Sequence, residues 1–453
     1  MPSKGISKLE TSSIGKLMAE LCVQATFSVM LYNIYIITDT LFVSKGVGST
    51  ASGAIGVFSP VLVFVGGISS TLGVGSGSII SRRLGEKDLK GGKTVIGCMV
   101  WIWCLCALVI TAIGLLFLNP LLSLLGCTVE IYPYAAEYGR IMLLGTICST
   151  GFSGVMRAGG DTLYSTLQWC CPVLINMALD PVLIYGFQMG ITGAALATVC
   201  AQMFSLLCSI YYFFIRSATP CKIRIKDIRW DFRAFKEILS IGMPSFLNSL
   251  GNSFVGMAGN QILGTVYGTQ AISTFTVISR IQTFATTPFT GVMQGIQPML
   301  GFDWGRKNTG RVRKTVFLAL RFVLIYGGLI SLGLYAGAPY IIRLFSADAD
   351  VMLAGTPALQ IICWAACAGG VMPVTQTFYQ ALGQGKKVLR LSMVCIFLIR
   401  IPFLLLGGIT KNISIMWWVF VSSDWAAAVM AGFSYKKYQK ERSDGKLNKE
   451  QTE

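Results

Sequence analysis

Long runs of apolar residues recur along the whole chain, separated by short polar connections. A helix needs about 20 predominantly apolar residues to cross the hydrocarbon core of a membrane. Runs of this length are found at roughly 16–43, 52–80, 94–118, 133–156, 163–187, 191–215, 237–263, 270–300, 315–343, 351–381, 388–409 and 413–435. The pattern predicts an all-α integral membrane protein with twelve transmembrane helices.

The composition agrees with a membrane protein and argues against an enzyme. Of 453 residues, 53% are hydrophobic and 13% are charged, which leaves too little polar surface for a water-soluble globule of this size. There is no histidine, so catalytic Ser-His or Cys-His pairs are impossible, and no phosphate-binding loop motif is found. We therefore expect neither catalysis nor a resident cofactor.

The basic residues are distributed unevenly among the connections. The net charge is +17, yet the odd-numbered connections contain only Lys45, Arg343 and Lys411 as basic residues. Because Lys and Arg resist translocation, we expect both termini in the cytoplasm of a multi-pass protein of the cell (plasma) membrane, as in a bacterial inner membrane. The basic connections can contact anionic membrane lipid, and nucleic acid is not an expected partner.

The chain also repeats itself at an offset of about 220 residues. Gly48 and Ala51 correspond to Gly268 and Ala271, and 85–88 corresponds to 305–308. Because each repeat has an even number of spans, the two lobes are predicted to have the same orientation in the membrane, as in rocking secondary transporters. The alternative is a receptor, channel or scaffold that carries the same duplication. The expected units are a tail (1–15), an N-lobe (16–215), a basic linker (216–236), a C-lobe (237–435) and a second tail (436–453).

Two acidic residues are expected inside the membrane, at a cost on the order of 3 kcal/mol each on insertion scales. Asp39 lies six residues before Lys45, Asp180 six before Gly186, and Thr198 lies eight after Gly190. At ~1.5 Å per residue, all three are ~9–12 Å below the outer face. Spans one, five and six therefore place three polar groups at one level.

Helical spacing adds two further residues to this group. Tyr35 and Asp39 are four residues apart, as are Asn176 and Asp180, so each pair lies on one helix face. Such oxygen-rich surroundings suit either a shared proton or a Na⁺ ion held by Asp39, Asn176, Asp180 and Thr198. In the structural alternative, Asp39 caps a helix and Asp180 is bonded to Asn176.

Other ionisable residues within the spans are less informative. Asp424 could contact a cationic substrate or pair with Arg280, Arg321 or Arg400, and we take Asp424 and Arg280 as candidate residues of a substrate cleft. Glu137 and Arg140 are three residues apart and are expected to neutralise each other.

Motifs spread over nearly the whole chain resemble those of the multidrug and toxic compound extrusion (MATE) family of antiporters. They are Asp39-Thr-Leu-Phe-Val43, Ser81-Arg-Arg-Leu-Gly-Glu-Lys-Asp88, Met156-Arg-Ala-Gly-Gly-Asp161, the Asn176, Asp180 and Pro181 group, Gly193-Ala-Ala-Leu-Ala-Thr198 and Gln294-Gly-Ile-Gln-Pro298.

The resemblance implies two six-helix lobes around a central cleft and efflux of amphipathic, often cationic, small molecules by alternating access. Inward movement of H⁺ or Na⁺ would drive the efflux. Carried over from the family, the cation-site positions are Tyr35, Asp39, Asn176, Asp180 and Thr198. Nothing in the sequence requires more than a monomer.

The alternative is a flippase for a lipid-linked saccharide, or an exporter of another metabolite with the same fold. A flippase would need a basic central cleft, because it moves an anionic headgroup. It would be favoured if three or more of the four arginines within spans (Arg140, Arg280, Arg321 and Arg400) lined one cavity.

Overall fold

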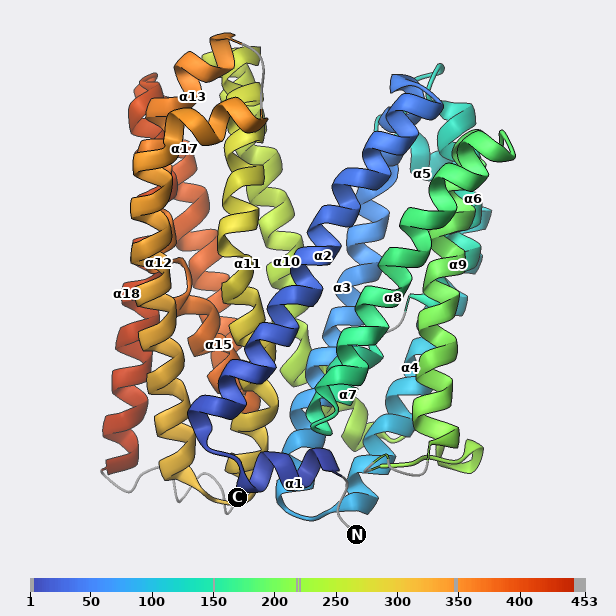
Figure 1. Cartoon of the computed structure of the whole chain (residues 1–453), viewed down its shortest axis with the longest axis vertical. Coiled ribbons are helices and arrows are strands. Elements are labelled where there is room, and N and C mark those ends of the chain that lie inside the picture. The colour runs from blue at the N-terminus through green and yellow to red at the C-terminus, as the bar shows by residue number, and fades with distance from the viewer. Residues whose placement is uncertain (1–3, 150, 217–218, 220, 346–348, 444–453) are drawn as a thin grey trace.

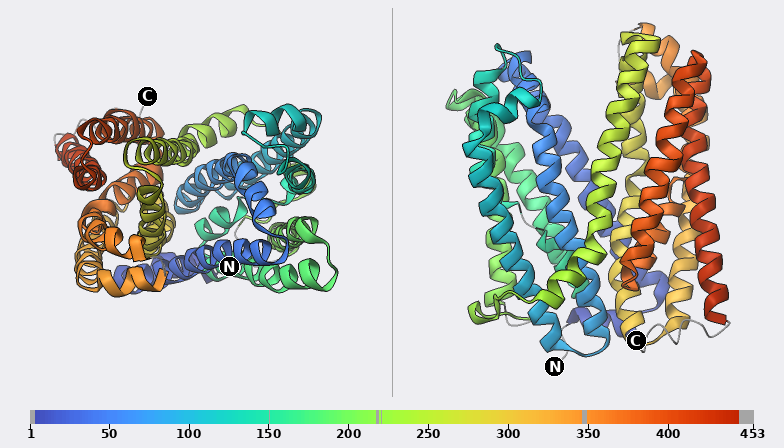
Figure 2. Two further views of the ribbon diagram at one scale, coloured as in Figure 1. Left: turned by 90° about the horizontal axis from the view of Figure 1, so that it is seen from above. Right: turned by 180° about the vertical axis from the view of Figure 1, so that it is seen from behind.

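The computed structural model describes residues 4–149, 151–216, 219, 221–345 and 349–443, and within them the secondary structure is helical. The predicted tails and linker lie partly outside these ranges. Viewed from above, the N-terminal and C-terminal halves form two bundles that lie side by side (Figure 2).

The N-lobe consists of α2 (Ile14–Gly46), α3 (Ser49–Gly85), α4 (Leu89–Leu116), α5 (Leu118–Leu124), α6 (Tyr132–Leu144), η1 (Gly145–Cys148), α7 (Phe152–Ala158), α8 (Thr162–Pro181), η2 (Val182–Gly186), α9 (Gly190–Ile210) and η3 (Tyr211–Ile215). The C-lobe consists of α10 (Phe232–Tyr267), α11 (Thr269–Gly305), α12 (Thr309–Phe345), α13 (Ala349–Ile362), α14 (Ala365–Gly369), α15 (Val371–Ala381), α16 (Gly385–Met393), η5 (Val394–Arg400), α17 (Ile401–Thr410) and α18 (Ile413–Ser443). A short helix, α1 (Lys4–Thr11), precedes the N-lobe, and η4 (Ile225–Asp227) lies between the lobes in sequence.

Ten helical segments of the described chain are long and apolar enough to cross a membrane. The two remaining long helices, α10 and α11, have 36 and 37 residues and pack against the other lobe, α10 on α3 and α11 on α2. With these two helices, each lobe has six spans, which confirms the predicted twelve-helix, two-lobe architecture.

The lobes are in closest contact at the end of the molecule that carries α1 and the last turn of α18, which we call the terminal face (Figure 1). There the repeat-related glycines Gly85 of α3 and Gly305 of α11 meet. A Cβ atom on Gly85 would lie 2.2 Å from the Phe302 carbonyl oxygen, and one on Gly305 would lie 2.1 Å from the Arg82 carbonyl oxygen. Only glycine allows the two backbones to approach this closely.

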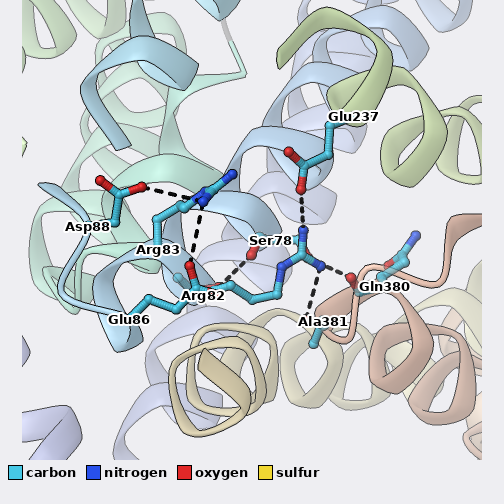
Figure 3. A network of polar contacts seen from close by, with 9 residues as sticks. Ser78, Arg82, Arg83, Glu86, Asp88, Glu237, Gln380 and Ala381 are labelled. Atoms are coloured by element: carbon cyan, nitrogen blue, oxygen red, sulfur yellow. Dashed lines mark hydrogen bonds and ion pairs between the residues drawn. The ribbon is translucent and has the colours of Figure 1, made fainter. Parts of the chain in front are cut away.

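Polar side chains reinforce the contact beside these glycines (Figure 3). Arg82 of α3 is 8% exposed, and its Nη2 lies 2.9 Å from Glu237 Oε1 of α10. Its Nη1 donates to the Ala381 carbonyl oxygen of α15 at 3.4 Å, and Ser78 Oγ donates to the Gln380 carbonyl oxygen at 2.6 Å. One arginine therefore joins the N-lobe to two helices of the C-lobe.

Helix α1 lies across the terminal face and contacts both lobes (Figure 1). Its Gly5 packs so closely on the α7–α8 turn that a Cβ atom would be 2.7 Å from the Gly159 carbonyl oxygen. On the C-lobe side, Glu10 Oε1 lies 2.9 Å from Arg306 Nη2, and Arg311 donates to the Leu9 carbonyl oxygen at 3.1 Å. Part of the predicted N-terminal tail is thus a helix docked on both bundles.

We predict that Gly85→Ala lowers the free energy of unfolding by about 1–3 kcal/mol, because the added methyl group collides with the backbone of α11. Thermal unfolding of the purified protein in detergent measures the effect. Gly66→Ala in the same helix is the matched control, since a Cβ atom there meets nothing within 4 Å. If the two variants unfold at the same temperature, the close helix crossing does not contribute to stability.

Candidate functional site

Helices α8 and α9 pack together and hold a buried polar group in the N-lobe. Asp180 is 0% exposed, Asn176 2% and Thr198 7%. Asn176 Nδ2 lies 3.3 Å from Asp180 Oδ1 and 3.3 Å from Thr198 Oγ1. When the Asn176 amide is oriented so that both its nitrogen and its oxygen have suitable partners, Nδ2 donates to Asp180 Oδ2 at 2.9 Å and the amide oxygen accepts from Thr198 Oγ1 at 3.3 Å.

Helix α2 brings the second carboxyl group to the same place. The side chains of Asp39 and Asp180 are within hydrogen-bond reach of each other, and the Tyr35 hydroxyl is within reach of Thr198. An ionised carboxylate only accepts hydrogen bonds, so two carboxyl groups can bond to each other only if one of them carries a proton. The structure thus brings together all five residues that the sequence analysis grouped.

The local backbone explains why a functional group can be placed here. Pro181 follows Asp180 directly, and it lacks the N–H group that would bond to the carbonyl oxygen four residues earlier in α8. Helix α8 ends at Pro181, and the chain continues as the wider π-helical turn Val182–Gly186. Such turns occur often at functional sites because they change the direction of neighbouring groups.

A cavity of about 180 Å³ adjoins the buried pair inside the N-lobe. Tyr35, Asn176 and Thr198 line one end of it, and Gln168 and Trp169 of the earlier part of α8 line it further toward the terminal face. The wall is mostly polar and aromatic, so it can hold water or a small polar solute.

Tyr138 of α6 is a further residue of this site that the sequence analysis did not identify. Its side chain is 4% exposed, and the charges of both Asp39 and Asp180 act on it. Its ring packs edge-on against Phe58, with 5.9 Å between ring centroids. No spacing pattern marks Tyr138, because Tyr132 and Tyr134 precede it in the same helix and its charged neighbours, Glu137 and Arg140, are exposed.

A second cavity, of about 580 Å³, lies between the lobes in the half of the molecule away from the terminal face, and we call it the interlobe cleft. Residues of α2 and α3 form one wall, and residues of α10 and α11 form the other. The lining residues are Asn33, Ile36, Ile37, Thr40, Leu41, Ser44, Ser52, Gly256, Asn260, Phe275, Thr276, Ser279, Arg280, Thr283 and Phe284.

The two candidate cleft residues are separated in the structure. Arg280 lines the interlobe cleft, whereas Asp424 lies in a cavity of about 230 Å³ inside the C-lobe. There Arg400 Nη2 lies 2.9 Å from Asp424 Oδ1, and Arg400 Nη1 donates to Asn252 Oδ1 at 2.6 Å. Of the partners considered for Asp424, Arg400 is the one that the structure shows.

The remaining ionisable residues do not add to either site. Glu137 accepts a hydrogen bond from Thr192 Oγ1 at 3.2 Å, and within the described residues the expected Glu137–Arg140 ion pair is not formed. Arg140 and Arg321 line neither the interlobe cleft nor the C-lobe cavity. The described part of the chain also has no group of three His, Cys, Asp or Glu side chains able to hold a metal ion.

We predict that Arg400→Gln and Asp424→Asn each lower the stability, by roughly the 1.5–3 kcal/mol of a charge-assisted hydrogen bond. Each single change leaves one half-buried charge without its partner. The double variant should recover part of the loss, because it removes both charges. Thermal unfolding of the four proteins provides the double-mutant cycle, and purely additive losses would show that the pair is not coupled.

Comparison with known proteins supports the architecture. The MatE family model matches residues 25–182 and 244–406, which is more than half of the chain. A multidrug export protein MepA of Staphylococcus aureus (strain MSSA476) is 25% identical over 389 residues, covering 85% of this chain and 86% of the relative. MepA of Staphylococcus haemolyticus (strain JCSC1435) is 27% identical over 390 residues, covering 85% of each.

Solved structures match the fold at similar levels of identity. A crystal structure of MATE in the straight conformation has a TM-score of 0.91 and 24% identity, covering 97% of this chain and 98% of that chain. A MOP superfamily transporter from Pyrococcus furiosus Vc1 has a TM-score of 0.91 and 23% identity, covering 97% and 99%. These structural matches show the fold alone, whereas the family model covers the helices that carry Asp39 and Asp180. The chain therefore belongs to the MatE family of membrane transporters.

Proposed function

We propose that this protein is a multidrug efflux antiporter that exports amphipathic small molecules through the interlobe cleft in exchange for a coupling ion. The MatE family match and the relatives named multidrug export proteins support this function. The cleft volume of about 580 Å³ is in the range of drug-sized ligand sites. The wall is mostly apolar and uncharged polar, with Arg280 as its charged residue, and suits ligands that are themselves amphipathic.

The coupling ion in this proposal is H⁺. The observation that supports it is the close approach of Asp39 and Asp180, because two neighbouring carboxyl groups cannot both ionise cheaply and one of them then retains a proton. Asn176 supports this choice, because its Nδ2 points at Asp180 and so presents a donor, not an oxygen ligand, to the carboxyl group.

The shape of the molecule supports a particular exchange cycle. The terminal face, expected in the cytoplasm, is closed by Arg82, Glu237 and α1, and the interlobe cleft lies on the other side of this contact. In the proposed cycle, the described conformation faces outward: a proton enters the N-lobe and joins the carboxyl pair while the substrate leaves. The contacts at the terminal face then open, and the proton is released inward.

The alternative of a flippase for a lipid-linked saccharide has less support. A pyrophosphate headgroup carries several negative charges and calls for several cations in one cleft. One arginine, Arg280, lines the interlobe cleft, whereas Arg400 is in the C-lobe cavity and is paired with Asp424.

We predict that Asp39→Asn and Asp180→Asn each abolish efflux driven by a pH gradient, because an amide cannot take up and release the transferred proton. The measurement is transport into everted vesicles, with pH and sodium gradients imposed separately. Wild-type transport should respond to the pH gradient and not to sodium. Glu137→Gln is the matched control, since Glu137 is an exposed carboxylate of the same lobe outside the site.

Two results would contradict this part of the proposal. Undiminished pH-driven efflux by both variants would remove the carboxyl pair from the coupling mechanism. Efflux driven by sodium alone and lost in the same variants would keep the site but make Na⁺ the coupling ion.

A further inference from the structure

The interlobe cleft contains one charged side chain among its described lining residues, that of Arg280. Ile36, Ile37 and Thr40 of α2 line the cleft, and none of its described lining residues is acidic. Asp39 lies on another face of α2, where it is within hydrogen-bond reach of Asp180. The negative charges of the N-lobe are therefore directed away from the cleft.

Arg280 is also unpaired within its own lobe. It is exposed, and in the described part of the chain neither an ion pair nor a hydrogen bond reaches its guanidinium group. Arg400, in contrast, is paired with Asp424 at 2.9 Å. An uncompensated cation in a membrane span is costly, and such residues usually mark a pathway or a binding site.

Arg280 lies within α11 and not at its end. It is eleven residues after Thr269, the first residue of α11, and thus about 16 Å along the helix from the end away from the terminal face. This distance is more than an arginine side chain can span, so the guanidinium group stays in the cleft that Arg280 lines.

The residues around Arg280 indicate which kind of ligand it can bind. Phe275 and Phe284 lie on the same wall, and Thr276 and Thr283 are the hydroxyl residues one turn before and one turn after it. The guanidinium group is suited to a carboxylate, which it can hold through two parallel hydrogen bonds. The aromatic rings provide flat apolar surface for the remainder of the molecule.

We propose that Arg280 is a specificity-determining residue that selects aromatic compounds bearing a carboxylate, zwitterions included, over otherwise identical esters. This inference rests on the proposed export function for its biological meaning, but it is a statement about binding and can be tested separately. A single cation distinguishes such ligands from diphosphates, which would call for more than one.

Rhodamine 110 and rhodamine 123 are suitable probes, because the second is the methyl ester of the first and lacks its free carboxylate. Binding of each dye to purified protein in lipid nanodiscs is measured by fluorescence anisotropy. The wild type should bind rhodamine 110 more tightly than rhodamine 123. Arg280→Gln should weaken rhodamine 110 binding about tenfold or more, as expected for loss of a charge-assisted hydrogen bond, and change rhodamine 123 binding less than about twofold.

Two further variants complete the design. Arg280→Lys keeps the positive charge but not the two parallel hydrogen-bond donors. It should retain part of the preference for rhodamine 110 over rhodamine 123. Arg321→Gln removes one positive charge from α12 outside both cavities and should leave both dyes unaffected. The proposal is overturned if rhodamine 110 does not bind, if the wild type shows no preference, or if Arg280→Gln changes both dyes equally.

Efflux of the same dyes separates this inference from the proposed function. Gradient-driven export of rhodamine 123 without discrimination by Arg280 would keep the function and reject the inference. Selective binding of rhodamine 110 without gradient-driven export of either dye would keep the inference and reject the function.

Discussion

A carboxylate in a membrane span must find compensation within the protein, and the N-lobe is organised around this requirement at Asp180. This residue is fully buried, and the groups around it come from four helices: Asp39 from α2, Tyr138 from α6, Asn176 from α8 itself and Thr198 from α9. No basic side chain is among these groups, and Asn176 donates a hydrogen bond to the Asp180 carboxyl group. In the proposed mechanism, a proton shared with Asp39 moderates the remaining negative charge, and its release would alter interactions among the four helices.

The closed terminal face is the second element on which transport depends. The close crossing at Gly85 and Gly305 leaves no space for side chains, and Arg82 joins α3 to α10 and α15. Buried apolar residues reinforce these contacts, because Ile79 and Leu84 of α3 belong to one hydrophobic cluster with Ile238 of α10 and Leu300 of α11. Opening of this face must therefore expose apolar surface as well as break polar contacts. Helix α1 adds contacts to both lobes at the same face and must release at least one of them when the face opens.

Much of the fold and most of the carboxyl site could be predicted from the sequence, for a simple reason. The rise per residue of a helix is constant, so counting from the ends of the spans places Asp39, Asp180 and Thr198 at one depth, and the i, i+4 spacing adds Tyr35 and Asn176. The arginine that pairs with Asp424 could not be predicted, because the pairing depends on how each helix is rotated about its own axis. Asp424 could reach several arginines by depth alone, and rotation placed Arg400 beside it and Arg280 in the cleft. Tyr138 was missed because the rotation of α6 that turns it toward the carboxyl pair is likewise not visible in the sequence.

The central claim is that Asp39 and Asp180 hold one proton that the substrate displaces. The most direct test is to add rhodamine 123 to purified protein in weakly buffered detergent solution and to measure protons released with a pH indicator. The account predicts release by the wild type, and none by Asp39→Asn or Asp180→Asn although both still bind the dye. Equal proton release by the wild type and both variants would contradict it.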